Sequence, residues 1–165
     1  VNIPGGEIFT SLQQGAIDAA EWVGPYNDLA FGLYRAAKYC YYPGWQEPGP
    51  TLECMVNKTA YESLPDDLKA ILDACCRAIN DDMLAEYTAR NQDAFKQLVE
   101  IHKVEFRRLP DSVLAALREQ ADAVLAELAA KDAFAKRVHD SFVAYREQVR
   151  AWSAVSEVPY FQSRA

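Results

Sequence analysis

The sequence predicts an α/β fold that ends in long helices. Short apolar segments and short helical patterns alternate over the first 60 residues, separated by Pro- and Gly-rich turns. Two long helical patterns follow, and each opens with Leu-Pro-Asp, at residues 64–66 and 109–111. Proline is tolerated in the first turn of a helix and aspartate is favourable at its positive end. We expect an α/β part over residues 1–110 and a helical part over residues 111–165.

The α/β part begins with a short helix. This helix is expected from Gly5 to Gln14, because Ile8 and Leu12 share one face and Gly15 would end it. Short apolar or aromatic runs that stop at Gly or Pro are typical of strands. The remaining elements expected here are strands at Ala16–Val23, Tyr39–Tyr42 and Thr51–Asn57 and a helix over residues 27–38.

The two long helical patterns differ in length. The first extends to about His102, and the alternating segment Val104–Arg108 predicts a strand after it. The second runs from Asp111 without Pro or Gly until Pro159, which is too long for one helix of a compact domain. We expect a break near Lys131–Asp132, a brace across two lobes, or packing on a partner chain.

Composition and charge exclude several classes of protein. Half of the 165 residues are apolar, which argues for a packed core. The net charge of −7 disfavours nucleic acid as a partner, since phosphate binding needs concentrated Lys and Arg. No segment approaches the roughly 18 uninterrupted apolar residues that a membrane span requires. An anionic ligand would need local positive charge or a bound cation on so acidic a chain.

The four cysteines do not predict a metal site. Cys40, Cys54, Cys75 and Cys76 form no C-x-x-C pattern, and the chain has only two histidines, so zinc is not expected. Cys75 and Cys76 lie side by side on an expected helix, and we interpret them as small buried apolar residues. Cys40 and Cys54 would be able to pair if the compartment is oxidising.

Two turns carry the candidate site. Glu21 and Trp22 precede Gly24-Pro25, and the turn at residues 42–50 places Glu47 near Trp45. Both turns follow expected strands, and α/β sheets bind ligands beyond the carboxyl ends of their strands. Three interpretations of the two glutamates compete. They are solvated loop residues, an acid–base pair for glycoside hydrolysis, or ligands of a hard cation. A helical interaction module, with both turns irrelevant to function, is a further alternative.

Three runs of sequence carry a resemblance to a known family. They are GEIFTSLQQGAIDAAEWVGPYND, AKYCYYPGWQEPGP and NKTAYESLPDDLKAIL. Together they resemble the carboxyl-terminal half of the solute-binding proteins of tripartite ATP-independent periplasmic (TRAP) transporters, within which the 2-oxo acid and lactate branch is the most similar. The similarity covers residues 5 to about 109.

The resemblance implies a two-lobed, periplasmic-binding-protein-like α/β fold with no catalytic activity. Such a protein closes in the periplasm over pyruvate, 2-oxobutyrate, lactate or a similar acid and delivers it to the TRAP membrane permease. The acid is held through Na⁺ or Ca²⁺. Carried over position by position, Glu21 and Glu47 supply carboxylate oxygens to the cation and Trp22 supplies its main-chain carbonyl. Trp22 and Glu47 also contact the substrate, Tyr26 lines the pocket, and Trp45 is a structural anchor.

The chain departs from the family in length. It begins at Val1 without a Met or a signal segment, and we expect it to be part of a longer protein. The amino-terminal part that members carry holds an arginine for the ligand carboxylate and another cation ligand. We therefore expect this chain alone to bind weakly or not at all.

The resemblance also gives the terminal helix two interpretations. In some members of the family this helix is exchanged between two subunits, which predicts a possible homodimer. Aromatic residues at its end suit an anchoring role on another surface: Trp152, Tyr160 and Phe161. Packing within one chain is the alternative.

Overall fold

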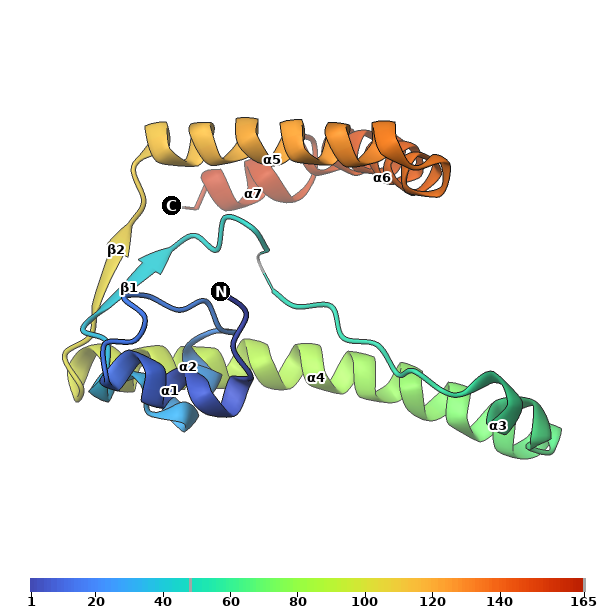
Figure 1. Ribbon diagram of the computed structural model, residues 1–165, viewed down its shortest axis with the longest axis horizontal. Coiled ribbons are helices and arrows are strands. Elements are labelled where there is room, and N and C mark those ends of the chain that lie inside the picture. The colour runs from blue at the N-terminus through green and yellow to red at the C-terminus, as the bar shows by residue number, and fades with distance from the viewer. Residues whose placement is uncertain (48, 165) are drawn as a thin grey trace. The chain divides into compact units, whose positions relative to one another are not determined.

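The computed structural model describes residues 1–47 and 49–164. The chain divides into two compact units, Val1–Leu109 and Pro110–Ala165, and each is described by itself (Figure 1). No helix in the described residues combines the length and hydrophobicity that crossing a bilayer requires.

The first unit contains most of the short elements. Its helices and strands are α1 (Gly5–Gln13), α2 (Pro25–Phe31), the 3₁₀ helix η1 (Leu33–Arg35), β1 (Tyr39–Tyr42), α3 (Lys58–Ser63), α4 (Asp66–Glu100) and β2 (Glu105–Arg108). The expected helix start at residues 64–66 is confirmed, because Pro65 is extended and precedes Asp66 and Asp67 in the first turn of α4. These carboxylates lie where the helix dipole favours negative charge.

The two strands form a parallel pair with α4 in the connection between them. Tyr39 pairs with Glu105 and Tyr42 with Arg108. Parallel strands need a long crossover, and α4 supplies it (Figure 1). Phe95 of α4 packs edge-on against Phe106 of β2 with ring centroids 4.7 Å apart. Both strands are therefore held by backbone pairing and by the carboxyl-terminal half of α4.

The core of the first unit lies along that half of α4. Ala94 and Leu98 are each 2 % exposed, and Val104 is also buried. The amino-terminal half of α4 differs, since Leu68 and Ile71 are exposed. The helix α2, which follows the Glu21–Trp22 turn, contacts the carboxyl-terminal half of α4 through the hydrogen bond from the N–H of Tyr26 to Oδ1 of Asn91.

Two expected strands do not form. Residues 16–23 carry no strand, because the N–H groups of Ala16 and Ile17 donate to the carbonyl of Ser11 and close the end of α1. Residues 51–57 are also outside any strand, and their side chains are all exposed. A strand exists through a paired neighbour, and no described segment pairs with either run. The apolar composition of a short segment is therefore not sufficient to predict a strand.

The expectation of buried cysteines on α4 is also wrong. Cys75 and Cys76 are both exposed, as is Cys54, while Cys40 in β1 is half-buried. The cause is their position on the part of α4 that lies away from the core. The four cysteines are unpaired thiols in the structure.

The second unit is made of helices only within the described residues. They are α5 (Asp111–Lys131), α6 (Ala133–Ser153) and α7 (Glu157–Gln162). The predicted break near Lys131–Asp132 is confirmed. Asp132 is extended, and its side chain accepts a hydrogen bond from the N–H of Ala135 at 2.6 Å, which caps α6. Arg146 of α6 lies 3.9 Å from Asp122 of α5 and links the two helices.

Candidate functional site

Trp22 is wedged between two helices of the first unit. Its ring lies 4.8 Å from that of Phe31 in α2, at 40°. On the α1 side it meets Gly5, where an added Cβ would come within 2.9 Å of the indole. The residue at position 5 must therefore be small. This packing fixes the backbone next to Glu21, whose own side chain is exposed.

The turn after Trp22 is tied to α4. The N–H of Tyr26 donates to Oδ1 of Asn91 at 2.9 Å, and the Tyr26 ring meets Tyr87 edge-on at 5.6 Å. The guanidinium group of Arg90 also lies over the Tyr26 ring, 5.5 Å from the ring centroid. Tyr26 is thus surrounded by residues of α4 and anchors the turn to the core. Its predicted role as a pocket wall stays a prediction.

A second carboxylate accompanies Glu21. Asp28 lies in the first turn of α2, and its pKa is raised to about 6, mainly by partial burial and to a smaller extent by the charge of Glu21. The charge of Glu21 thus disfavours ionisation of Asp28, and a cation bound at this turn would relieve that repulsion. The sequence reasoning missed Asp28. The sequence feature that could have pointed to Asp28 is its position as an acidic residue in the first helical turn after Gly24-Pro25.

Polar atoms without partners gather at the same turn. Within the described residues, Trp22 Nε1 and Asn27 Oδ1 are buried side-chain atoms that make no hydrogen bond. Such atoms are rare in folded proteins and mark positions where an additional ligand or water is accommodated. The amide oxygen of Asn27 is also a type of ligand that hard cations bind.

The turn with Glu47 has a tight backbone but an exposed surface. An added Cβ on Gly44 would lie 2.6 Å from the carbonyl oxygen of Glu47, so this position requires glycine. Glu47 is exposed, and Trp45 is 48 % exposed. The predicted anchoring of Trp45 is therefore wrong in this unit, because no core of the described chain covers its ring.

The structure brings together only part of the predicted set. Glu21, Trp22 and Asp28 share one turn and its helix. Across residues 1–47 and 49–164, no group of three or more His, Cys, Asp or Glu side chains is arranged to hold a metal ion. Any cation at this turn would thus need ligands other than a preformed cluster of these side chains, such as carbonyl and amide oxygens.

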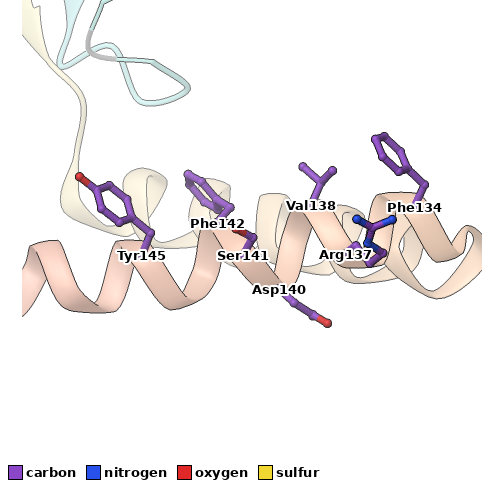
Figure 2. A pocket seen from close by; sticks show the side chains of 7 residues that line it. All are labelled: Phe134, Arg137, Val138, Asp140, Ser141, Phe142 and Tyr145. Carbon is purple, nitrogen blue, oxygen red and sulfur yellow. The ribbon is translucent and has the colours of Figure 1, made fainter.

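A separate exposed face occurs on α6 of the second unit. Figure 2 shows Phe134, Val138, Phe142 and Tyr145 projecting from one side of the helix. Each is more than half exposed. Such a continuous apolar face is unusual on a protein surface that contacts only water.

Comparison with protein families identifies the chain. The family of bacterial extracellular solute-binding proteins, family 7, matches residues 1–132. The chain belongs to this family. The predicted recognition is confirmed, and the family supports the prediction that the chain is not an enzyme. Nothing in the comparisons supports glycoside hydrolysis by Glu21 and Glu47.

Several relatives of this family-7 chain are informative. The monocarboxylate 2-oxoacid-binding periplasmic protein of Nostoc sp. is 40 % identical over 158 residues, which are 96 % of this chain and 43 % of that protein. A TRAP periplasmic solute-binding protein of Pseudoalteromonas atlantica, solved with sodium and pyruvate, is 42 % identical with a TM-score of 0.92. The similarity covers 99 % of this chain and 50 % of the Pseudoalteromonas protein.

Two further solved structures share the fold. The TRAP protein of Colwellia psychrerythraea, with bound calcium and pyruvate, has a TM-score of 0.92 and 38 % identity over 99 % of this chain and 50 % of its own. The TRAP protein of Bordetella bronchiseptica, a dimer with calcium and picolinate, has a TM-score of 0.95 and 33 % identity. The similarity covers 99 % of this chain and 48 % of the Bordetella protein. The predicted α/β binding-protein fold is thus confirmed. This chain spans about half the length of these relatives.

Proposed function

We propose that the chain is the carboxyl-terminal part of a periplasmic TRAP solute-binding protein for a small 2-oxo or 2-hydroxy monocarboxylate. The protein holds the acid through Na⁺ or Ca²⁺ and delivers it to the membrane permease. The observation that carries this proposal is that two structures with the fold of nearly the whole chain contain pyruvate together with a cation. The 2-oxoacid-binding relative from Nostoc supports the same substrate class.

The electrostatics of the first turn favour a cation-dependent mechanism. Glu21 lies close enough to Asp28 for its charge to contribute to the raised pKa of Asp28. A free carboxylate ligand would be repelled by both groups and by the net charge of −7. A sodium or calcium ion reverses the local sign and takes oxygen ligands from protein and substrate. Binding of the acid therefore depends on the cation.

Each proposed site residue has a separate role. Glu21 and Glu47 supply carboxylate oxygens to the cation, and Trp22 supplies its main-chain carbonyl. Trp22 and Glu47 also contact the substrate. The exposure of both carboxylates and the wedging of the Trp22 ring between Gly5 and Phe31 support these roles. The ring fixes the backbone whose carbonyl is used.

The decisive experiment is calorimetric titration of the full-length protein. Pyruvate, 2-oxobutyrate and lactate are titrated with Na⁺, with Ca²⁺ and after chelation without either ion. Glu21→Gln and Glu47→Gln should each weaken binding, by about tenfold or more if one ligand of the cation is lost. Glu119→Gln on α5 is the matched control and should bind like the unmodified protein. If none of the three acids binds with any cation, the proposed substrate class is wrong.

The α6 face supports a homodimer as a second part of the proposal. Its aromatic and aliphatic side chains are exposed in this unit, and the Bordetella relative is a dimer. A second copy of the chain that covers Phe134, Val138 and Phe142 would remove this apolar area from water. Light scattering of the full-length protein tests the assembly. Phe142→Asp should convert a dimer to a monomer, whereas a monomer before substitution would exclude the dimer.

A further inference from the structure

The segment that carries Glu21 is not held by backbone pairing. In the described residues, backbone hydrogen bonds close the end of α1 as far as Ile17 and resume with the N–H of Asp28, which donates to the carbonyl of Gly24. Between them, residues 18–23 make no backbone–backbone hydrogen bond within the described chain. The position of the backbone at Glu21 therefore depends on the contacts that hold the two ends of this segment.

Two anchors hold that backbone. The first is the ring of Trp22, which is wedged between α1 and α2. The second lies four residues further on, where the N–H of Tyr26 donates to Oδ1 of Asn91 in α4 at 2.9 Å. Pro25 lies between the anchors and has a fixed φ. The main chain around the Trp22 carbonyl is thus restrained from both sides.

The second anchor also supplies a cap that α2 lacks in its own sequence. Gly24 at the N-cap position has no side chain to accept a hydrogen bond, and Pro25 has no N–H. An N-cap side chain normally accepts from the second or third N–H of the helix. Tyr26 is the second residue of α2, and its N–H is the group that Asn91 accepts. Asn91 therefore caps α2 from a helix 65 residues later in the sequence.

The same face of α4 also holds the Tyr26 side chain. Tyr87, Arg90 and Asn91 are three or four positions apart and share one side of the helix. Tyr87 meets the Tyr26 ring edge-on at 5.6 Å, and Arg90 lies 5.5 Å from the ring centroid. These ring contacts restrain the side chain, whereas the hydrogen bond to the half-buried Asn91 restrains the direction of the backbone.

We propose that Asn91 is a positioning residue for the cation site. This inference rests on the proposed function, in which Glu21 and the main-chain carbonyl of Trp22 bind the cation. Asn91 does not contact the ion in this role, but it fixes the backbone that presents both oxygen ligands. Loss of a residue that orients metal ligands typically weakens binding by about 10- to 100-fold.

The test separates this positioning role from simple capping. Asn91→Ala in the full-length protein removes both the cap and the link to α4. The double variant Gly24→Ser, Asn91→Ala restores a cap within α2 itself but not the link. A serine fits, since an added Cβ on Gly24 would lie 3.5 Å from Asn91 Oδ1, an ordinary contact distance. Asn91→Asp keeps an acceptor oxygen, and Gln92→Ala, at an exposed amide of α4, is the matched control.

Calorimetry with pyruvate at saturating Na⁺ or Ca²⁺ measures affinity, and urea unfolding measures stability. Asn91→Ala should weaken pyruvate binding by about tenfold. The double variant should recover the urea midpoint but not the affinity, while Asn91→Asp and Gln92→Ala should bind like the unmodified protein. Normal binding by Asn91→Ala would overturn the proposal, as would recovery of both stability and affinity in the double variant.

A measurement without ligand separates this inference from the proposed function. The Val23 N–H belongs to the same peptide group as the Trp22 carbonyl, so its ¹⁵N relaxation in the ligand-free protein reports how firmly that carbonyl is held. This group should become more mobile in Asn91→Ala and in the double variant, but not in Gln92→Ala. Unchanged mobility would overturn the role of Asn91 even if pyruvate binds. Unmodified protein that binds no acid would instead refute the proposed function.

Discussion

Asp28→Asn should stabilise the protein at neutral pH in the absence of cation and substrate. The pKa of Asp28 is raised from 3.8 to about 6, first by burial and then by the charge of Glu21. The folded protein therefore binds a proton more tightly than the unfolded chain does. The free energy of unfolding should fall as the pH rises from about 4 to 6, and the full penalty should remain above pH 6.

The size of the effect follows from the shift. Two pKa units correspond to about 3 kcal/mol, and solvent screening of this partly exposed group reduces the expected value to about 1–2 kcal/mol. Asparagine has nearly the same shape and no charge, so it should remove this penalty and leave the packing of α2 unchanged.

Urea unfolding of the full-length protein at pH 5 and pH 7.5 measures the change. The unmodified protein should lose stability between the two values relative to Asp28→Asn, while Asp18→Asn, at an exposed position, serves as the control. Carboxyl-carbon NMR gives the pKa directly. A value near 4 for Asp28, or an asparagine variant that is less stable at pH 7.5, would refute the reasoning.

Two other substitutions test separate parts of the structure. Gly44→Ala should weaken pyruvate binding by about tenfold, because its Cβ would meet the backbone of Glu47 at 2.6 Å, whereas Gly49→Ala meets nothing within 4 Å and should bind normally. Equal affinities by calorimetry would contradict this role of the turn. Asp132→Ala removes the cap of α6 and should lower the free energy of unfolding, measured in urea, by about 1 kcal/mol. An unchanged urea midpoint would show that the cap does not contribute to stability.

Helix boundaries were predictable because their signals are local. Pro65 and Pro110 mark the starts of α4 and α5, and Asp132 both breaks the terminal helical pattern and caps the next helix. The chemistry of each boundary lies within a few residues and needs no distant partner.

Strands were predictable only where a described partner exists. Tyr39–Tyr42 pairs with Glu105–Arg108, but the equally apolar run 16–23 has no described neighbour. The selection of Glu21 was based on that run being a strand, so this part of the reasoning was wrong even though the turn is built around Trp22. Asp28 could not be found from composition, since its pKa depends on burial against the rest of the fold.

The two turns of the proposed site are held by different means, and this difference bears on how a ligand would act. Packing of Trp22 between α1 and α2 and the bond from Tyr26 to Asn91 fix the first turn before any ligand arrives. The second turn has an exposed Trp45 and an exposed Glu47. In the proposed site, a cation held by Glu21 would also take a carboxylate oxygen of Glu47, and the acid would add to this set of oxygens. By linkage, the acid must raise the affinity for the cation by the same factor that the cation raises the affinity for the acid.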